Sequence, residues 1–292
     1  MAGYLSLNYY LKQKFGERVQ KIPLDAGLTC PNRDGLKGRT GCIYCDSKGS
    51  GTGEASKGIS VEQQMLQGME WAKRRYKAGK FIAYFQSFSN TYAPLNRLEA
   101  IYKQALQGPN VVGVSIGTRP DCVDEERLSL IAHIFEGKMV WIELGLQSAH
   151  NETLKMINRG HTVEDFEQAV RLSKKFGFLV CAHVIFGLPG EGRQEMEHTI
   201  EYINALPVDG IKFHQLYILK NCPVYRLYKR GSLVPMAQEE YARMVAWSIK
   251  RLRPGVVIHR LTGDPPKHGL VAPMWSTDKA GTIHIINNLI SQ

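Results

Sequence analysis

Three cysteines lie within sixteen consecutive positions of this 292-residue chain, in the segment TCPNRDGLKGRTGCIYCD (residues 29–46). Cys42 and Cys45 form a Cys-x2-Cys pair, and Cys30 lies twelve positions before Cys42. Thiolates are ligands of zinc ions and of iron–sulfur clusters. The segment therefore predicts a metal site with Cys30, Cys42 and Cys45 as its ligands.

The residues around these cysteines bear on which metal they bind. A structural zinc site takes four protein ligands, usually cysteine or histidine, but the next cysteine is Cys122 and the first histidine is His133. A distant residue, or Asp34 or Asp46, would have to complete a zinc site. A four-iron cluster ordinarily takes four cysteines, so three cysteines would leave one iron open to an external ligand. Both kinds of site stay open on these residues alone.

Length and composition predict one large α/β domain in a reducing compartment. The chain is 43% hydrophobic, which is enough for a full core. It has no run of 18 apolar residues that could span a membrane, and its first twenty residues lack the apolar region of a signal peptide. We therefore expect a cytoplasmic protein without a membrane partner, whose cysteines are ligands, reactive thiols or core residues rather than disulfides.

The positive charge is concentrated at the two ends of the chain. The formal net charge is +10, and residues 1–80 hold 14 lysines and arginines against 7 acidic residues. Residues 243–267 hold 6 against 1, whereas residues 81–242 hold 16 against 18. Two basic ends indicate a polyanionic partner, with nucleic acid as the natural candidate. A charged surface that is merely solvated is the alternative.

Short β-rich runs alternate with helical segments along nearly the whole chain, which is typical of a parallel sheet with helices outside it. Two of the helices are expected to begin at capping boxes, Ser60 with Gln63 and Thr162 with Asp165. Six or seven such units should curl into a full or partial barrel, with functional residues at the C-terminal ends of the strands. The predicted strands are Val19–Leu24, Phe81–Gln86, Val111–Ile116, Val140–Leu144, Leu179–Phe186, Ile211–Leu216 and Val256–His259.

The three cysteines lie on a loop after the first strand of such a barrel, and the loop ends in Cys-x2-Cys with Tyr44 between the last two cysteines. This arrangement resembles the radical S-adenosylmethionine (radical SAM) superfamily. The common spacing there is Cys-x3-Cys-x2-Cys, whereas eleven residues separate Cys30 from Cys42 here. The longer gap is similar to that of the elongator-type tRNA-modifying branch and of the YhcC/YtqA-type bacterial family. The resemblance implies one [4Fe–4S] cluster on Cys30, Cys42 and Cys45, with S-adenosylmethionine chelating the open iron.

The same resemblance implies a partial TIM-type (β/α)6 radical SAM barrel with short terminal extensions. We assign residues 1–18 to an N-terminal extension, residues 19–255 to the barrel and residues 256–292 to a C-terminal extension that completes the substrate pocket. Candidate pocket residues in this last segment are Arg260, Asp264, His268 and Trp275.

The segment WIELGLQSAHNETLKMINRGH (residues 141–161) resembles the fourth-strand segment of the coproporphyrinogen-dehydrogenase and elongator branches. The family's cofactor-contacting glutamine and arginine map onto Gln147 and Arg159. These residue types suit a zwitterionic ligand, because a guanidinium grips a carboxylate and an amide can serve a ribose or amino group. A surface charge at a helix end is the plainer interpretation of Arg159.

The segment HVIFGLPGE (residues 183–191) resembles the fifth-strand motif whose backbone packs on the adenine of the cofactor. We expect Gly187 to allow a close backbone approach and Leu188 to provide apolar surface. His183 stands where the porphyrinogen branch has a carboxylate. It is either a cofactor contact or a core histidine.

The segment AYFQSFSNTYAP (residues 83–94) stands where the superfamily has a glycine-rich turn that supports the cofactor amino group. This chain departs from that pattern, because the segment has no glycine. Polar groups of Gln86, Ser87, Ser89 and Asn90 would replace the turn, and Gln86, Ser87 and Asn90 are candidate cofactor contacts.

The remaining cysteines, Cys122, Cys181 and Cys222, are isolated in the sequence, which predicts a single cluster. Cys122 follows the third predicted strand and is a candidate hydrogen-atom donor to a substrate radical. A small buried core residue is the alternative for both Cys122 and Cys222. Cys181 is expected to be structural.

The YhcC/YtqA-type resemblance runs nearly end to end and implies a substrate. That family is associated with remodelling of a carboxymethylaminomethyl group at C5 of the tRNA wobble uridine toward aminomethyl. It implies tRNA as a partner and a reducing partner such as flavodoxin or ferredoxin. A radical SAM enzyme acting on a porphyrinogen-like small molecule, and a zinc-binding nucleic-acid module without catalysis, are the alternatives.

Overall fold

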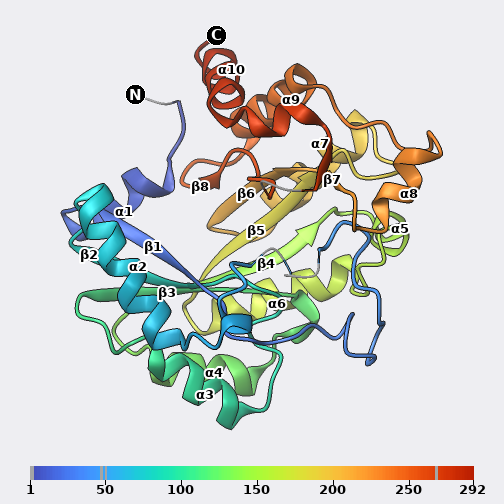
Figure 1. Ribbon diagram of the computed structural model, residues 1–292. Helices are drawn as coiled ribbons and strands as arrows, with labels where there is room; N and C mark the ends of the chain where they lie inside the picture. The colour runs from blue at the N-terminus through green and yellow to red at the C-terminus, as the bar shows by residue number, and fades with distance from the viewer. Residues whose placement is uncertain (1–2, 47–48, 50, 267–268) are drawn as a thin grey trace.

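The computed structural model describes residues 3–46, 49, 51–266 and 269–292. A curled sheet of seven strands, in the order β1-β2-β3-β4-β5-β6-β8, forms the centre of this part of the chain (Figure 1). All neighbouring strands in it pair in parallel. The strands are β1 (Val19–Leu24), β2 (Lys80–Phe85), β3 (Val111–Thr118), β4 (Met139–Gln147), β5 (Leu179–Phe186), β6 (Gly210–Gln215) and β8 (Val257–Arg260).

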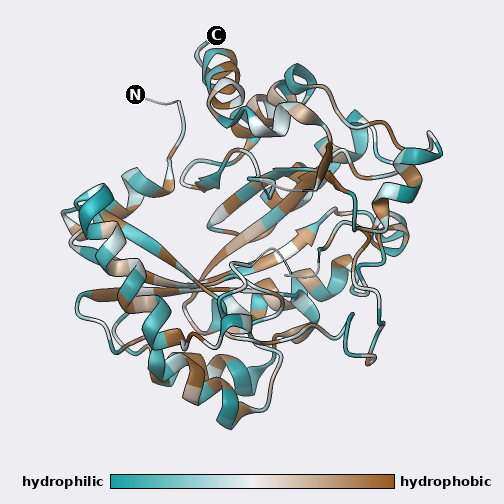
Figure 2. Ribbon diagram, in the orientation of Figure 1, coloured by the Kyte–Doolittle hydropathy of each residue, from teal (hydrophilic) through white to brown (hydrophobic). Residues whose placement is uncertain are grey.

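Helices cover the outer face of the curled sheet. They turn polar surfaces to solvent, while the strands form the hydrophobic interior (Figure 2). The predicted capping boxes are both present, with Ser60 and Gln63 at the start of α2 and Thr162 and Asp165 at the start of α6. The helices between strands are α2 (Val61–Tyr76), α3 (Leu95–Gln104), α4 (Glu125–Ile134), α5 (Asn151–Met156), α6 (Val163–Lys175), α7 (Arg193–Asn204), α8 (Val224–Lys229) and α9 (Gln238–Arg251).

The sheet is a partial barrel, as the sequence predicts. Its two edge strands are β1 and β8. The seventh strand, β8, comes from the segment assigned above to the C-terminal extension, and it pairs with β6. Short 3-10 turns, η1 (Ala55–Lys57) and η2 (Pro120–Cys122), follow β1 and β3.

The N-terminal segment packs at the end of the barrel where the strands begin. Helix α1 (Leu7–Phe15) places Leu11 against Val19, Trp141 and Val257 inside the curl. The carbonyl of Leu5, which precedes α1, accepts a hydrogen bond from the Ile258 N–H at 2.8 Å. This packing leaves the opposite end, where the strands finish, as the site of the functional loops.

The C-terminal residues form a second small unit against the barrel. A two-stranded antiparallel pair, β7 (Ile218–Leu219) with β9 (Leu270–Ala272), precedes η3 (Met274–Thr277) and α10 (Lys279–Ser291), which packs on α9. Trp275 donates its indole N–H to Met236 O at 2.8 Å, while Arg260 and Asp264 lie 3.8 Å apart. His268 lies outside the described residues. No described helix has the length and apolar character to cross a membrane.

Candidate active site

The three cysteines predicted as metal ligands line one cavity at the C-terminal ends of the strands. The Cys45 N–H donates to Cys42 O at 3.0 Å, and the Arg33 guanidinium donates to Cys45 O at 3.0 Å. The Ile43 N–H donates to Ile157 O at 3.1 Å, which ties the loop to the segment after α5. The empty space of this cavity, including space open to solvent, measures ≈ 730 Å³.

The three cysteine sulfurs do not all lie at the spacing found around a single zinc ion. Around one tetrahedral zinc, with Zn–S distances of about 2.3 Å, sulfur ligands lie about 3.8 Å apart. Among the described residues, the only three His, Cys, Asp or Glu side chains with ligand atoms all within 4.8 Å of one another are Glu143, Cys181 and His183. At least one pair of the three loop sulfurs is therefore more than 4.8 Å apart, wider than the spacing around one zinc ion.

Arg159 lies beside Cys42 as a buried cation. Its Nη1 donates to Cys42 Sγ at 3.6 Å and its Nη2 to Gly145 O at 2.9 Å. Burial alone would raise the pKa of the Cys42 thiol, but the charge and hydrogen bond of Arg159, with Arg119 nearby, lower it below its ordinary value. Burial raises the pKa of Cys45 to about 12. Since metals bind the thiolate, this environment favours Cys42 as a metal ligand.

Several buried polar atoms at this end of the sheet have no hydrogen-bond partner within the described chain. They include Ser87 Oγ, Ser89 Oγ, Asn90 Oδ1 and Arg159 Nε. Because buried polar atoms are normally paired, such atoms beside a cavity indicate a missing ligand. Ser89 and Arg159 both line the cavity, so a polar ligand carrying a carboxylate, such as S-adenosylmethionine, fits there.

The end of β4 has an irregular backbone next to Arg159. Gln147 has a φ of +76°, which is strained for a residue with a side chain. The pairing of β4 with β5 shifts between Gly145 and Gln147. A Cβ at Gly145 would lie 2.6 Å from both Arg159 Nη2 and Gln147 Nε2. The irregular strand end and the missing side chain thus let Gln147 and Arg159 approach each other at the cavity.

The structure brings together most of the side chains predicted from the sequence. Cys30, Cys42, Cys45, Gln86, Gln147, Arg159 and His183 all line the cavity. Ser87 and Asn90 are buried beside it without lining it, and the Asn90 Nδ2 donates to Gly117 O at 2.8 Å. A Cβ on Gly187 would meet Met236 at 2.9 Å, and Leu188 lies in a hydrophobic cluster. These four cofactor-contact assignments stay predictions.

Cys122, the predicted hydrogen-atom donor, is buried in η2 and does not line the cavity. Burial, aided by the neighbouring Asp121, raises its pKa to about 12, so it keeps its proton. The Thr91 hydroxyl donates to its carbonyl at 2.6 Å. The catalytic role of Cys122 stays a prediction.

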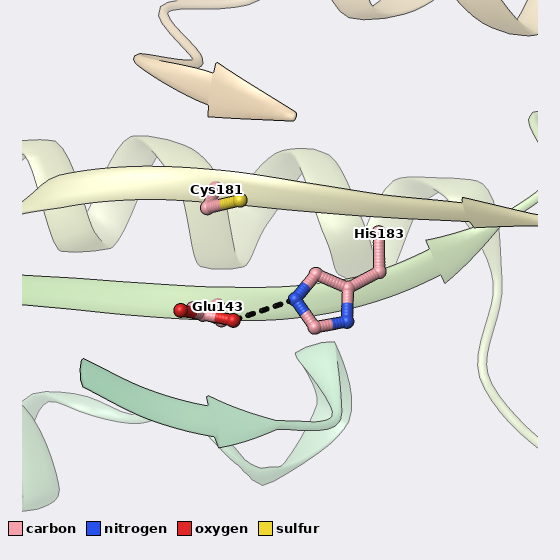
Figure 3. A group of neighbouring side chains, drawn as sticks. All are labelled: Glu143, Cys181 and His183. Atoms are coloured by element: carbon pink, nitrogen blue, oxygen red, sulfur yellow. Dashed lines mark hydrogen bonds and ion pairs between the residues drawn. The ribbon is translucent and has the colours of Figure 1, made fainter. Parts of the chain in front are cut away.

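A buried charged cluster that the sequence analysis did not predict lies on the inner face of the sheet below the cavity. Its centre is Glu143 of β4, whose carboxylate accepts hydrogen bonds from Lys21 of β1, Lys212 of β6, and the Ser115 hydroxyl of β3. His183 Nε2 lies 2.8 Å from Glu143 Oε2 (Figure 3). We call Lys21, Tyr84, Ser115, Glu143, His183, Lys212 and His259 the floor cluster. The signal for it was charged residues at the centre of otherwise apolar strands.

The floor cluster is a poor cation site, although Glu143, Cys181 and His183 lie close together (Figure 3). Two ammonium groups, those of Lys21 and Lys212, already occupy the Glu143 carboxylate. Burial raises the pKa of the Cys181 thiol, so this sulfur stays protonated. A metal ion would meet two positive charges and a thiol, and we assign these residues no metal.

Family models match two adjoining parts of the chain. Residues 30–203 match the radical SAM superfamily, and residues 208–291 match the Radical_SAM C-terminal domain. The protein YtqA of Bacillus subtilis is 38% identical over 97% of this chain and 88% of its own length. Protein YhcC of Escherichia coli is 37% identical over 92% of this chain and 86% of its own length.

More distant relatives match part of the chain. The tRNA uridine(34) acetyltransferase of Methanocaldococcus infernus is 29% identical over 53% of this chain, which spans 29% of that relative. A solved structure of the Elp3 protein from the same archaeon has a TM-score of 0.68 at 21% identity. It matches 75% of this chain and 56% of its own. This likeness confirms the predicted partial barrel.

Proposed function

Because this chain belongs to the radical SAM superfamily, we propose that it is the radical SAM enzyme that remodels the C5 side chain of the tRNA wobble uridine, from carboxymethylaminomethyl to aminomethyl. Its cofactors, as its family implies, are a [4Fe–4S] cluster and S-adenosylmethionine. Together these supply a 5′-deoxyadenosyl radical. The C–H bonds next to the substrate amine are not acidic, so hydrogen-atom abstraction suits them better than acid–base chemistry.

Different residues of the cavity would bind the cluster and S-adenosylmethionine. Cys30, Cys42 and Cys45 would bind the cluster. Arg159 would bind the carboxylate of S-adenosylmethionine, since it is a buried guanidinium with an unpaired Nε at the cavity. Gln147 would serve the ribose or amino group from the strained end of β4.

A basic surface beside the cysteine loop supports tRNA as the substrate. Residues 220–230 contain Lys220, Arg226, Lys229 and Arg230 and no acidic residue. All four are exposed, and none forms an ion pair with a described residue. Two tyrosines lie among them, and Lys229 stands 5.8 Å from the ring centre of Tyr225. We call residues 220–230 the α8 surface.

The position of the α8 surface carries this proposal. The Val224 N–H at the start of α8 donates to Ile43 O, between two of the cysteines, at 2.9 Å. Figure 1 shows α8 next to α5, on the side of the barrel where the strands end. Unpaired basic groups bind phosphates, and tyrosines can stack on single-stranded bases. An anticodon loop on this surface would have its wobble base near the cavity.

The proposal is tested by incubating reconstituted enzyme, S-adenosylmethionine and a reductant with tRNA that carries carboxymethylaminomethyluridine. We expect aminomethyluridine by mass spectrometry of the digested nucleosides, and none with a Cys42→Ala variant. Formation of 5′-deoxyadenosine without any change in the tRNA, with every reductant tried, would contradict the proposal.

The contribution of the α8 surface is tested separately by tRNA binding. A variant with glutamine at Arg226, Lys229 and Arg230 should bind tRNA more weakly. The slope of log affinity against log salt should fall by about 0.7–0.9 for each phosphate that the variant no longer neutralises. The control carries the same charge change at Lys12, Lys14 and Arg74, exposed residues near the other end of the barrel. An equal effect of the two variants would contradict this placement.

The alternative of a porphyrinogen-like small-molecule substrate makes the opposite prediction for the same experiment. It expects no salt-sensitive tRNA binding at all. The alternative of a zinc module without catalysis expects no iron and no cofactor cleavage, and family membership favours the enzyme over it.

A further inference from the structure

We propose that the floor cluster binds a carboxylate of the substrate at the bottom of the cavity. The inference deepens the proposed function and rests on it, because the carboxymethylaminomethyl group ends in a carboxylate. It assigns the binding of that group to Lys212, supported by Lys21 and Arg260.

The cluster has more positive than negative charge. Glu143 is its one carboxylate, and the ammonium groups of both Lys21 and Lys212 are ion-paired to it. Glu143 is 1% exposed and Lys212 is 4% exposed. Burial lowers the pKa of Lys212, and the Glu143 carboxylate opposes this shift. When both lysines are protonated, two buried ammonium groups share one carboxylate, and a bound anion would neutralise the second positive charge.

A third cation stands next to the cluster on β8. Arg260 is partly exposed, and its nearest carboxylate, Asp264, lies 3.8 Å away and also accepts from Lys279 at 2.8 Å. Burial lowers the pKa of His214 most, and the positive charge of Arg260 lowers it further. The positive surroundings keep the nearby histidines neutral, since burial and Lys212 together lower the pKa of His183 to about 4.

Lys21 and Lys212 differ in how many of their N–H donors have hydrogen-bond partners. Lys21 meets three partners: Glu143, Ser115 Oγ at 2.9 Å and His259 Nδ1 at 3.5 Å. Lys212 meets Glu143 and the Tyr84 hydroxyl at 2.7 Å. An ammonium group has three N–H donors, and among the described residues two of those on Lys212 have partners, which leaves one for a ligand.

Three members of the floor cluster line the cofactor cavity. Tyr84, Glu143 and His183 line that cavity together with Gln147 and Arg159. Tyr84 and Glu143 are also the two hydrogen-bond partners of Lys212. Lys212 itself does not line the cavity and lies directly behind these two side chains. A substrate carboxylate would reach its ammonium group by displacing the Tyr84 hydroxyl. A carboxylate anchored there would hold the adjoining methylene and amine in the cavity, next to the cofactor residues.

The first test measures the binding of a small probe to the reconstituted holoenzyme in the presence of S-adenosylmethionine. The enzyme is left unreduced, so that it cannot turn over. The probe is sarcosine, which reproduces the carboxymethylamino end of the substrate, and its carboxylate-free partner is N-ethylmethylamine. By calorimetry, sarcosine should bind about tenfold tighter or more, as expected for one charge-assisted hydrogen bond. Lys212→Met should abolish this difference.

Two further variants separate binding from folding. Lys212→Arg keeps the charge and should keep a preference for sarcosine. Lys174→Met removes a partly buried lysine that pairs with Asp209 at 2.7 Å on the outside of the barrel, and it should leave the preference intact. A wild-type enzyme without the preference, or a Lys212→Met variant that retains it, would overturn the inference.

The second test uses one tRNA in two forms, with carboxymethylaminomethyluridine or aminomethyluridine at the wobble position. The unreduced wild type should bind the first form more tightly, and Lys212→Met should bind both alike. Equal binding of the two forms by the wild type, while the tRNA is still converted, overturns the inference and leaves the proposed function standing. Sarcosine preference without any tRNA conversion supports the carboxylate site and refutes tRNA as the substrate.

Discussion

Replacing Glu143 with glutamine should be among the most destabilising single changes of a polar residue in this protein. The substitution keeps the shape of the side chain and removes the one carboxylate shared by Lys21 and Lys212. Breaking a buried ion pair by removing one partner costs about 3–5 kcal/mol. At an unfolding entropy of about 2.1 cal/mol/K per residue, that loss lowers the midpoint of thermal unfolding by about 5–8 °C.

The opposite substitution, Lys212→Met, should be much milder. It leaves one ammonium for one carboxylate, and a hydrophobic side chain of similar length fills the space. We expect a loss of less than about 2 kcal/mol. In the double variant the two effects should not add, because the second lysine is the charge that Glu143→Gln leaves unpaired. A coupling free energy of about 1–3 kcal/mol is expected.

The assay is urea unfolding of the cluster-free protein under reducing conditions at pH 7.5, followed by circular dichroism. Lys174→Met again serves as the control for loss of an ion-paired lysine elsewhere. A Glu143→Gln variant within about 1 kcal/mol of wild type, or a Lys212→Met variant that is destabilised as much as Glu143→Gln, would refute the charge assignment of the floor cluster.

Three further predictions concern pH, the cysteines and the end of β4. First, burial and Lys212 lower the pKa of His183 to about 4 from an ordinary 6.5, although Glu143 opposes them. Between these values the unfolded chain takes up a proton that the folded chain does not, so the free energy of unfolding of the cluster-free protein should fall as pH drops from 6.5 to 4. His183→Gln should reduce the slope by the contribution of one proton, while His161, His214 and His259, whose pKa values are also lowered, keep the rest. An unchanged slope would contradict the burial of a neutral His183. Second, alanine at Cys30, Cys42 or Cys45 should abolish iron binding and visible absorbance after reconstitution, whereas Cys181→Ala should retain both; iron retained in all three loop variants would place the cluster elsewhere. Third, Gly145→Ala would put a Cβ 2.6 Å from Arg159 and Gln147. The affinity of this variant for S-adenosylmethionine, measured by equilibrium dialysis, should fall about tenfold or more with the cluster still bound. A variant with wild-type affinity would show that these two side chains do not bind the cofactor.

Local patterns in the sequence predicted the elements of the fold, and they identified three candidate metal ligands that line one cavity. The capping boxes at Ser60 and Thr162 depend on residues three positions apart, and both are present. The cysteine spacing and the motifs around Gln147 and Arg159 depend on short segments as well. These motifs meet at one cavity because parallel strands finish at the same edge of the sheet.

The floor cluster could not be predicted in the same way. Lys21, Glu143 and Lys212 are more than sixty residues apart from one another, and each alone is a charged residue in a strand. Their meeting depends on strand register and on the curl of the sheet, which local sequence does not specify. The positive φ of Gln147 also had no local signal, because glycine, asparagine and aspartate are the residues that usually adopt a positive φ.

The most direct measurement follows a hydrogen atom from the tRNA to the cofactor. The tRNA carries deuterium on the carbons next to the amine of carboxymethylaminomethyluridine, and the enzyme is reconstituted, reduced and supplied with S-adenosylmethionine. We predict that mass spectrometry finds deuterium in 5′-deoxyadenosine as aminomethyluridine appears. Unlabelled 5′-deoxyadenosine, formed at the same rate with and without the tRNA, would contradict a radical reaction at the wobble uridine.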